Sequence, residues 1–423
     1  MNRRVSKLVP VLLVIALIAT LAGSLTGCAK KETGDIVIGA VYPLTGNLAI
    51  QGNAALTGAD IAREMVNEEG GVLGRKVVFE VADAPDPAAA TNETQRLITE
   101  KKVKVVIGSY SSSISIAASA VTERNNVIWA EQGGMSVGVT NRGFKYTFRA
   151  TPNTDQVGFG AAELVAQQIA PALGMDAKAM KIAVIHEDSA FGTGVADAFK
   201  AKAAELGLNV VLVEPYSAKS TDLAPLVLKV KGAAPDVLVA TQYLNDQILF
   251  QKQAKELDLY VKAFIGSGGT VGMTDFRNAM GAATEGVMEV DGPSTDILRS
   301  QLDAKQVALL DEFLKRYKAR TGSDQPPSPA TNGFFATSLL LREVLPKAGA
   351  VDPDKIRDAY MSLNIPEGQT PLGFGVKFGA DGQNQRTFMI VRQWQGDRYV
   401  VVGPDKWKIS DIRGIPLKPW SER

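Results

Sequence analysis

Val103-Lys104-Val105-Val106-Ile107-Gly108 is followed at once by Ser109-Tyr110-Ser111-Ser112-Ser113, and a helical segment is expected over 115–124. The first run is short and mostly β-branched, which predicts a strand with both faces covered. The serines form a polar turn before the predicted helix. This stretch therefore predicts one strand–turn–helix unit of an α/β fold.

The same alternation recurs through most of the chain. Apolar runs suit parallel strands, and the segments between them keep apolar residues on one helical side. Such alternation argues for α/β layers joined by right-handed crossovers, in two blocks, 35–152 and 154–290. The other predicted strands are 36–41, 77–81, 127–130, 182–185, 210–213 and 237–240, and the predicted helices are 54–67, 155–169, 195–206, 223–231 and 247–257.

The last part of the chain changes character. A proline-rich break at 325–329 interrupts a helical stretch, and turn residues then separate short β-branched runs. These runs predict strands joined by tight turns. The predicted helices are 302–320, 330–344 and 354–361, and the predicted strands are 374–378, 387–394 and 398–402.

Composition excludes several classes of protein. The 423 residues include 46 basic and 45 acidic side chains, one cysteine and one histidine. This length suggests two domains, and the near-zero net charge gives no electrostatic reason to bind nucleic acid. One cysteine cannot form an internal disulfide, and one histidine cannot form a multi-histidine metal site. We therefore expect no metal and no other cofactor.

Residues 1–27 are predicted to be a signal peptide. Three basic residues precede an apolar run, 8–21, that is short for a membrane span. The run leads to Leu25-Thr26-Gly27-Cys28, which resembles the bacterial lipobox, whose cysteine becomes the lipid-modified first residue. The alternative is a buried free cysteine. We expect Cys28 to anchor an extracytoplasmic domain to the membrane through a tether, 28–34.

Gly134-Met135-Ser136-Val137-Gly138 matches the G-x-S-x-G pattern of a hydrolase nucleophile elbow. With Ser136 as the nucleophile, His186 would be the base and Asp155 the orienting acid. The elbow needs its serine on a sharp strand-to-helix turn, but the preceding strand is expected to end near Ala130. We therefore favour a glycine-rich loop, with a serine hydrolase as a remote alternative.

The serines after Ile107 are the most unusual polar group in the sequence. Hydroxyls and free N–H groups at a helix N-terminus favour a small anion such as a carboxylate. Helix capping explains one or two of these serines, but four of them with Tyr110 exceed that need. Ligands of open α/β sheets bind beyond the carboxyl ends of strands. The same rule marks 133–136, Phe191, Tyr243 and 266–270, each of which follows a predicted strand.

Taken together, the chain resembles the branched-chain (hydrophobic) amino-acid substrate-binding proteins of ABC importers, from about Ile36 to the C-terminal strands. The resemblance implies the type I periplasmic-binding fold, in which two doubly wound parallel-sheet lobes are joined by three crossovers. The ligand would be trapped in the cleft as the lobes close. The segments that carry the resemblance are 38–46, Gly52 with Thr57-Gly58-Ala59, 67–74, 105–108 with its serines, Arg142-Gly143-Phe144, Phe191-Gly192-Thr193-Gly194 and 236–239.

On this resemblance we divide the chain into a signal peptide, a tether and two lobes. The expected partners are a small-molecule ligand, a membrane permease and the membrane itself, which the lipid anchor contacts. The protein is expected to be a monomer. The predicted parts are 1–27 and 28–34, then 35–152 plus 291–370 for lobe 1 and 153–290 plus 371–423 for lobe 2, with crossings near 151–153, 290–293 and 369–372.

The resemblance also implies roles for residues of the first lobe. Ser112 would hold the ligand carboxylate, with Tyr110 and Ser111 beside it, and Gln51 would lie at the pocket edge. In the loop that contains Gly134, Gly133 would offer a carbonyl to the ligand ammonium. Met135 would offer a backbone N–H to the carboxylate. From the second lobe, Phe191 and Tyr243 would close on the ligand.

Three positions depart from the family's leucine binders. Met135 replaces a threonine, Phe191 replaces a tyrosine, and Gly268 replaces the glutamate that pairs with the ligand ammonium. A buried ammonium without a carboxylate would be costly. Either Glu131 or Asp246 supplies the missing acid, or the ligand is not an α-amino acid.

We therefore expect a solute-binding lipoprotein rather than an enzyme. Its expected ligand is an apolar or branched-chain amino acid held between two closing lobes. The main alternative is the same fold binding a small amide or an aromatic or aliphatic carboxylate.

Overall fold

The computed structural model describes residues 33–293, 295 and 299–423. Residues Ile36–Arg423 form a compact unit that contains the whole α/β fold. The predicted signal peptide and Cys28 lie outside the described residues. Within the described part of the chain, no helix has the length and apolar character needed to cross a membrane.

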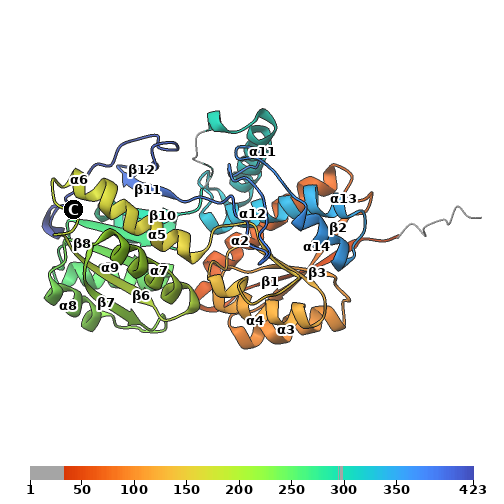
Figure 1. Ribbon diagram of the computed structural model, residues 1–423, viewed down its shortest axis with the longest axis horizontal. Helices are drawn as coiled ribbons and strands as arrows, with labels where there is room; N and C mark the ends of the chain where they lie inside the picture. The colour runs from red at the N-terminus through yellow and green to blue at the C-terminus, as the bar shows by residue number, and fades with distance from the viewer. Residues whose placement is uncertain (1–32, 294, 296–298) are drawn as a thin grey trace, which may run out of the picture. The chain divides into compact units, whose positions relative to one another are not determined.

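The first sheet has five parallel strands in the order β2-β1-β3-β4-β5. Its central strands are buried along most of their length, as expected for apolar strands covered on both faces. Figure 1 shows helices α3 and α4 beside this sheet. The elements are β1 (Ile36–Tyr42), β2 (Val77–Asp83), β3 (Val105–Gly108), β4 (Ile128–Glu131), β5 (Thr147–Arg149), α2 (Ala49–Glu68), α3 (Pro87–Thr99) and α4 (Ser112–Arg124).

The second sheet has seven strands in the order β12-β11-β10-β9-β8-β6-β7. Strands β6 to β10 are parallel, whereas β11 pairs antiparallel with both β10 and β12. The elements are β6 (Lys181–Glu187), β7 (Asn209–Tyr216), β8 (Val237–Thr241), β9 (Ala263–Ser267), β10 (Met288–Asp291), β11 (Ile390–Gln395), β12 (Arg398–Gly403), α5 (Thr154–Leu164), α7 (Ala190–Leu206), α8 (Ala224–Ala233), α9 (Leu244–Glu256) and α10 (Thr274–Met280).

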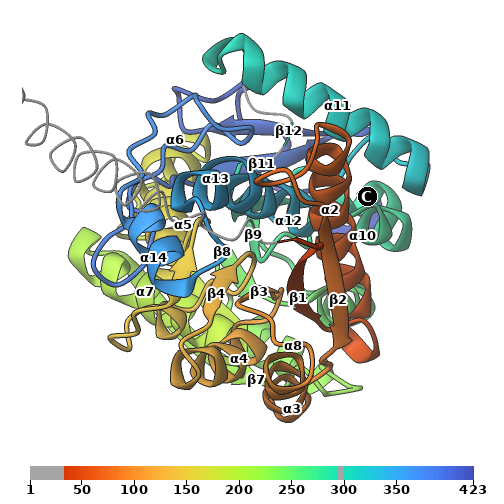
Figure 2. The same ribbon diagram turned by 90° about the vertical axis from the view of Figure 1, so that its right-hand side faces the viewer.

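Two parallel-sheet lobes are therefore present, which confirms the predicted fold class. Later helices return to the first lobe, because residues of α12 and of the segments after it share the core of β1, β3 and β4. In Figure 2 this lobe, with strands β1 to β4, faces the viewer. These helical segments are α11 (Ala304–Thr321), α12 (Ser328–Leu339), a π-helical turn at Leu340–Val344, α13 (Leu345–Ala348) and α14 (Pro353–Met361).

Residues 372–378 differ from the prediction in two ways. They form isolated bridges, Ile365 with Val376 and Phe378 with Asn384, rather than a regular strand. Leu372 and Phe374 also pack in the core of the first lobe, although the predicted division places 371–423 in the second. We therefore propose that the third crossing lies between residues 379 and 389, just before β11.

Helix α12 packs closely against α2 because each helix presents a glycine to the other. A Cβ atom on Gly58 would lie 1.8 Å from the carbonyl oxygen of Ala330, and one on Gly333 would lie 2.2 Å from that of Ala55. Any side chain at either position would force the helices apart. This packing fixes the N-terminal turn of α12, which reaches the cleft described below.

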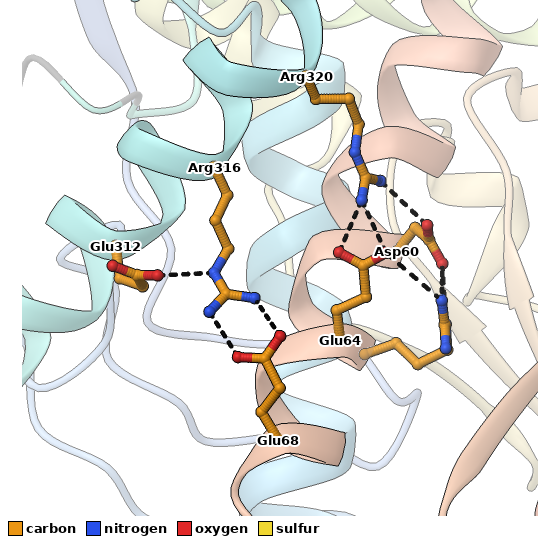
Figure 3. A network of polar contacts seen from close by, with 7 residues as sticks. Asp60, Glu64, Glu68, Glu312, Arg316 and Arg320 are labelled. Atoms are coloured by element: carbon orange, nitrogen blue, oxygen red, sulfur yellow. Dashed lines mark hydrogen bonds and ion pairs between the residues drawn. The ribbon is translucent and has the colours of Figure 1, made fainter.

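Ion pairs hold α11 against α2 at the surface (Figure 3). Arg316 makes a bidentate pair with Glu68, at 2.8 and 2.6 Å, and Arg320 contacts both Glu64 and Asp60. Exposed pairs contribute little one at a time, but a connected network restrains several side chains together. Phe313 of α11 also stacks on Phe334 of α12, with ring centroids 4.1 Å apart.

Candidate functional site

A pocket lies where the carboxyl ends of the strands of both sheets meet. Sequence reasoning predicted six of its lining residues and missed four. The six are Tyr110, Gly133, Met135, Phe191, Tyr243 and Gly268, and the four are Asp291, Ser328, Pro329 and Asn332. The missed residues come from the end of β10 and the first turns of α12.

Aromatic rings from both lobes form the pocket's apolar wall. The ring centroid of Tyr243 lies 6.0 Å from that of Tyr110 and 6.2 Å from that of Phe191. All three side chains are buried and pack with Met135 in one cluster. The rings thus offer apolar surface to a ligand from both lobes.

Direct hydrogen bonds join the lobes across the cleft. The Tyr110 hydroxyl donates to the Gly268 carbonyl at 2.9 Å, and the Asn245 side chain donates to the Asn47 carbonyl at 3.2 Å. The lobes are therefore in contact across the cleft.

Helix α4 begins at Ser112, three residues earlier than predicted, with Ser111 as its N-cap. The Ser112 Oγ atom accepts a hydrogen bond from the Ser136 N–H at 3.0 Å. Ser112 thus fixes the loop that presents Met135, and it is not among the residues that line the pocket. Its predicted contact with a ligand carboxylate stays a prediction.

Glu131 is buried and fully engaged with its own loop. One carboxylate oxygen accepts from the N–H groups of Gln132, Gly133 and Gly134, and the other accepts from the Trp129 indole at 2.7 Å. Burial raises the pKa of Glu131. Glu131 is not among the residues that line the pocket, so it is not positioned to pair with a ligand ammonium. This differs from the prediction that Glu131 could supply the missing acid.

Arg149 binds the same loop through its carbonyl groups. The fully buried guanidinium donates to the carbonyl oxygens of Gly134 and Ser136, at 2.9 and 2.7 Å, and to Gln383. Burial lowers the pKa of Arg149 to about 10. A buried acid and a buried base therefore hold the loop that carries Gly133 and Met135.

Gly268 adopts a backbone conformation that disfavours the glutamate implied by the resemblance. Its φ angle is +100°, and a Cβ atom there would lie 3.1 Å from the Phe191 ring. Side chains strain the backbone at such φ values. Glycine at position 268 thus leaves room for the Phe191 ring to pack against the backbone.

The Gln51 side chain is buried in α2, and neither its amide oxygen nor its amide nitrogen has a hydrogen-bond partner among the described residues. It does not line the pocket in this closed arrangement. Its predicted position at the pocket edge stays a prediction.

Comparison with known proteins shows which family the chain belongs to. A model of the periplasmic binding protein family matches residues 35–398. The chain belongs to this family. It is 37% identical over 400 residues to "Leu/Ile/Val-binding protein homolog 8" of Brucella abortus (strain 2308), covering 93% of this chain and 98% of the relative. It is 35% identical over 397 residues to "Leu/Ile/Val-binding protein homolog 7" of the same organism, covering 94% and 98%.

Solved structures share the fold of this periplasmic binding protein. A leucine-binding protein of Thermotoga maritima superposes with a TM-score of 0.73 at 22% identity, covering 88% of this chain and 99% of that one. A solute-binding protein of an ABC transporter from R. palustris, in complex with benzoate, gives 0.74 at 20% identity, covering 91% and 100%.

The hydrolase residues of this periplasmic binding protein are not brought into a catalytic arrangement. The Ser136 Oγ atom accepts from the Gly138 N–H, and the His186 Nδ1 atom contacts the Glu187 carbonyl at 3.0 Å. Among the described residues no hydrogen bond joins Ser136 to His186. Ser136 starts a short 3-10 turn rather than the helix that a nucleophile elbow requires.

Asp246, the second predicted substitute acid, caps α9 instead of lining the pocket. Its carboxylate accepts from the Tyr216 hydroxyl and from the Tyr243 N–H at 3.2 Å. The buried position raises the pKa of Asp246 to about 7. Asp246 therefore positions Tyr243 and is not among the residues that line the pocket.

Asp246→Asn is expected to gain stability relative to the wild type as pH rises. The unfolded chain ionises Asp246 near its ordinary pKa of about 4, so the folded state of the wild type loses stability between about pH 4 and pH 7. The asparagine variant lacks this loss. Melting temperatures of both proteins from pH 4 to pH 8 test it, and a difference that does not change with pH would contradict the assignment.

Proposed function

We propose that this chain is a lipid-anchored, extracytoplasmic solute-binding protein of an ABC importer, and that its ligand is an apolar or branched-chain amino acid. The observation that carries the proposal is the pocket at the facing strand ends, with three aromatic rings and Met135 around it. Curated relatives that match nearly the full chain are described as Leu/Ile/Val-binding protein homologues, which supports the same ligand class.

The two ends of the pocket suit the two ends of such a ligand. Met135, Phe191 and Tyr243 offer apolar surface to a branched side chain. The first turn of α4 and the glycine-rich loop at 133–135 lie together, since Ser112 bonds to Ser136. The N–H groups of Gly133 and Gly134 donate to Glu131. The Met135 N–H and the N–H groups and hydroxyls of the α4 turn would therefore receive the carboxylate without a charged partner.

A second candidate ligand is an aromatic or aliphatic carboxylate without an amine. Gly268 favours it, because the family's ammonium-pairing glutamate is missing at that position. A solved protein of the same fold holds benzoate. A thermal-shift panel separates the candidates. Stabilisation by leucine, isoleucine or valine, but not by 4-methylpentanoate or benzoate, supports the amino acid, and the reverse result supports the amine-free acid.

Ser112→Ala is expected to weaken binding of either ligand class by roughly 1–3 kcal/mol, the cost of losing a hydrogen bond to a charged group. Calorimetric titration of the variant measures the loss. Ser113→Ala is the matched control, because Ser113 is the next residue of the same helical turn but is only partly buried. An unchanged dissociation constant for Ser112→Ala would contradict the assignment of the carboxylate to this turn.

A further inference from the structure

The pocket contains a carboxylate that none of the expected site residues supplied. Of the described residues that line the pocket, Asp291 is the one acid, and its side chain is 3% exposed. It stands at the carboxyl end of β10, where the chain leaves the second sheet. The acid missing at Gly268 is therefore present in the same pocket, on the neighbouring strand.

Asp291 retains accepting capacity after its protein contacts are counted. One oxygen accepts from the Gly292 N–H at 2.7 Å, and the other accepts from the Ser328 hydroxyl and from Arg392 at 3.0 Å. A carboxylate offers about four acceptor sites. One site is therefore left for a donor on the pocket side.

Helix α12 adds a second acceptor beside it. Asn332 follows Ser328 by four residues, so the two side chains share one face of the helix. Both line the pocket, and the Asn332 amide oxygen is buried without a hydrogen-bond partner among the described residues. A buried acceptor of this kind is costly unless something donates to it.

The charge balance of the surroundings favours a cation. Glu289 and Asp291 are both buried, and Arg392 is the base beside them, with its Nη2 atom 3.8 Å from the Glu289 carboxylate. Glu289 is occupied by the N–H groups of Thr270 and Val271 and by the Tyr399 hydroxyl. Burial raises the pKa of both acids, to about 7 for Glu289, so a ligand cation beside Asp291 would favour its ionised form.

We propose that Asp291, Ser328 and Asn332 form the subsite that receives the ligand's ammonium group, replacing the glutamate that Gly268 removes. This inference rests on the proposed function and narrows its ligand class to compounds with an amine. Asp291 and Asn332 accept from the ammonium, and Ser328 orients the Asp291 carboxylate. Arg392 donates to the Asp291 carboxylate and leaves one of its acceptor sites open.

The test compares L-leucine with 4-methylpentanoate, which is leucine without the amine. Both are titrated by calorimetry into the wild type, Asp291→Asn and Asn332→Leu. Ser338→Ala is the matched control, since Ser338 is a buried polar residue of the same helix that lies outside this pocket. We expect the first two variants to lose about tenfold or more in leucine affinity, while 4-methylpentanoate changes far less. The control should bind as the wild type does.

Different failures of this test have different meanings. Equal loss of both compounds in the variants would assign Asp291 and Asn332 a purely structural role and overturn the subsite alone. Wild-type binding of 4-methylpentanoate in preference to leucine would also overturn the subsite, while the solute-binding role stands. Binding of neither compound by a folded wild type would overturn the proposed ligand class as well. If Asp291→Asn does not fold, Asn332→Leu decides by the same ratio of affinities.

Discussion

Glu131→Gln is expected to lower the free energy of unfolding by about 3–5 kcal/mol, the usual cost of removing one partner from a buried charged network. The carboxylate accepts four hydrogen bonds, three from backbone N–H groups and one from the Trp129 indole. A glutamine offers one accepting oxygen, so its NH2 group must face a donor. The variant also removes the acid that offsets the buried charge of Arg149.

Urea unfolding followed by circular dichroism measures this loss. Glu93→Gln is the control, because Glu93 makes a surface pair with Arg96 and should change stability little. A Glu131→Gln variant as stable as this control would show that the loop at 132–136 does not depend on the buried carboxylate. Such a result would contradict our account of how the pocket's first-lobe wall is held.

Gly268→Glu is expected to weaken ligand binding by about 100-fold or more, equivalent to nearly 3 kcal/mol, although it restores the side chain found in leucine binders of the family. The backbone at φ +100° strains any side chain, and the new Cβ atom would press on the Phe191 ring. The Tyr110 hydroxyl would also lose its closing contact with the Gly268 carbonyl if the backbone moved.

Titration of the variant with leucine tests this expectation. Gly396→Glu is the control for backbone strain alone, because Gly396 has φ +63° at a turn where a Cβ atom meets nothing within 4 Å. The control should lose some stability but retain affinity. Tighter leucine binding by Gly268→Glu would contradict the view that Phe191 and Gly268 form one packed unit, and it would remove the need for Asp291.

The sequence predicted the part of the site that follows strands. Tyr110, Phe191 and Tyr243 each come just after a strand, and parallel strands place their carboxyl ends along one edge. The pattern could not tell that Glu131, also at a strand end, turns back to bind its own loop. That outcome depends on where three backbone N–H groups point, which no spacing rule encodes.

Local sequence patterns could not predict the pocket residues that α12 contributes. Ser328 and Asn332 are distant in sequence from the strand-end loops, and they reach the pocket through the glycine contacts between α12 and α2. The proline-rich break predicted where a helix begins, but it did not predict that the helix reaches the pocket. Asp291 ends β10, a strand that was not predicted from the sequence, so a search for acids at the predicted strand ends would not have found it.

The most direct test of the central claim is to identify, by mass spectrometry, the small molecule that co-purifies with the protein from its expression host. The protein is purified without added ligand, denatured, and the released compound is quantified against the chain. The account predicts an apolar α-amino acid, leucine, isoleucine or valine, at up to one molecule per chain. Release of an amine-free carboxylate as the stoichiometric compound would contradict it.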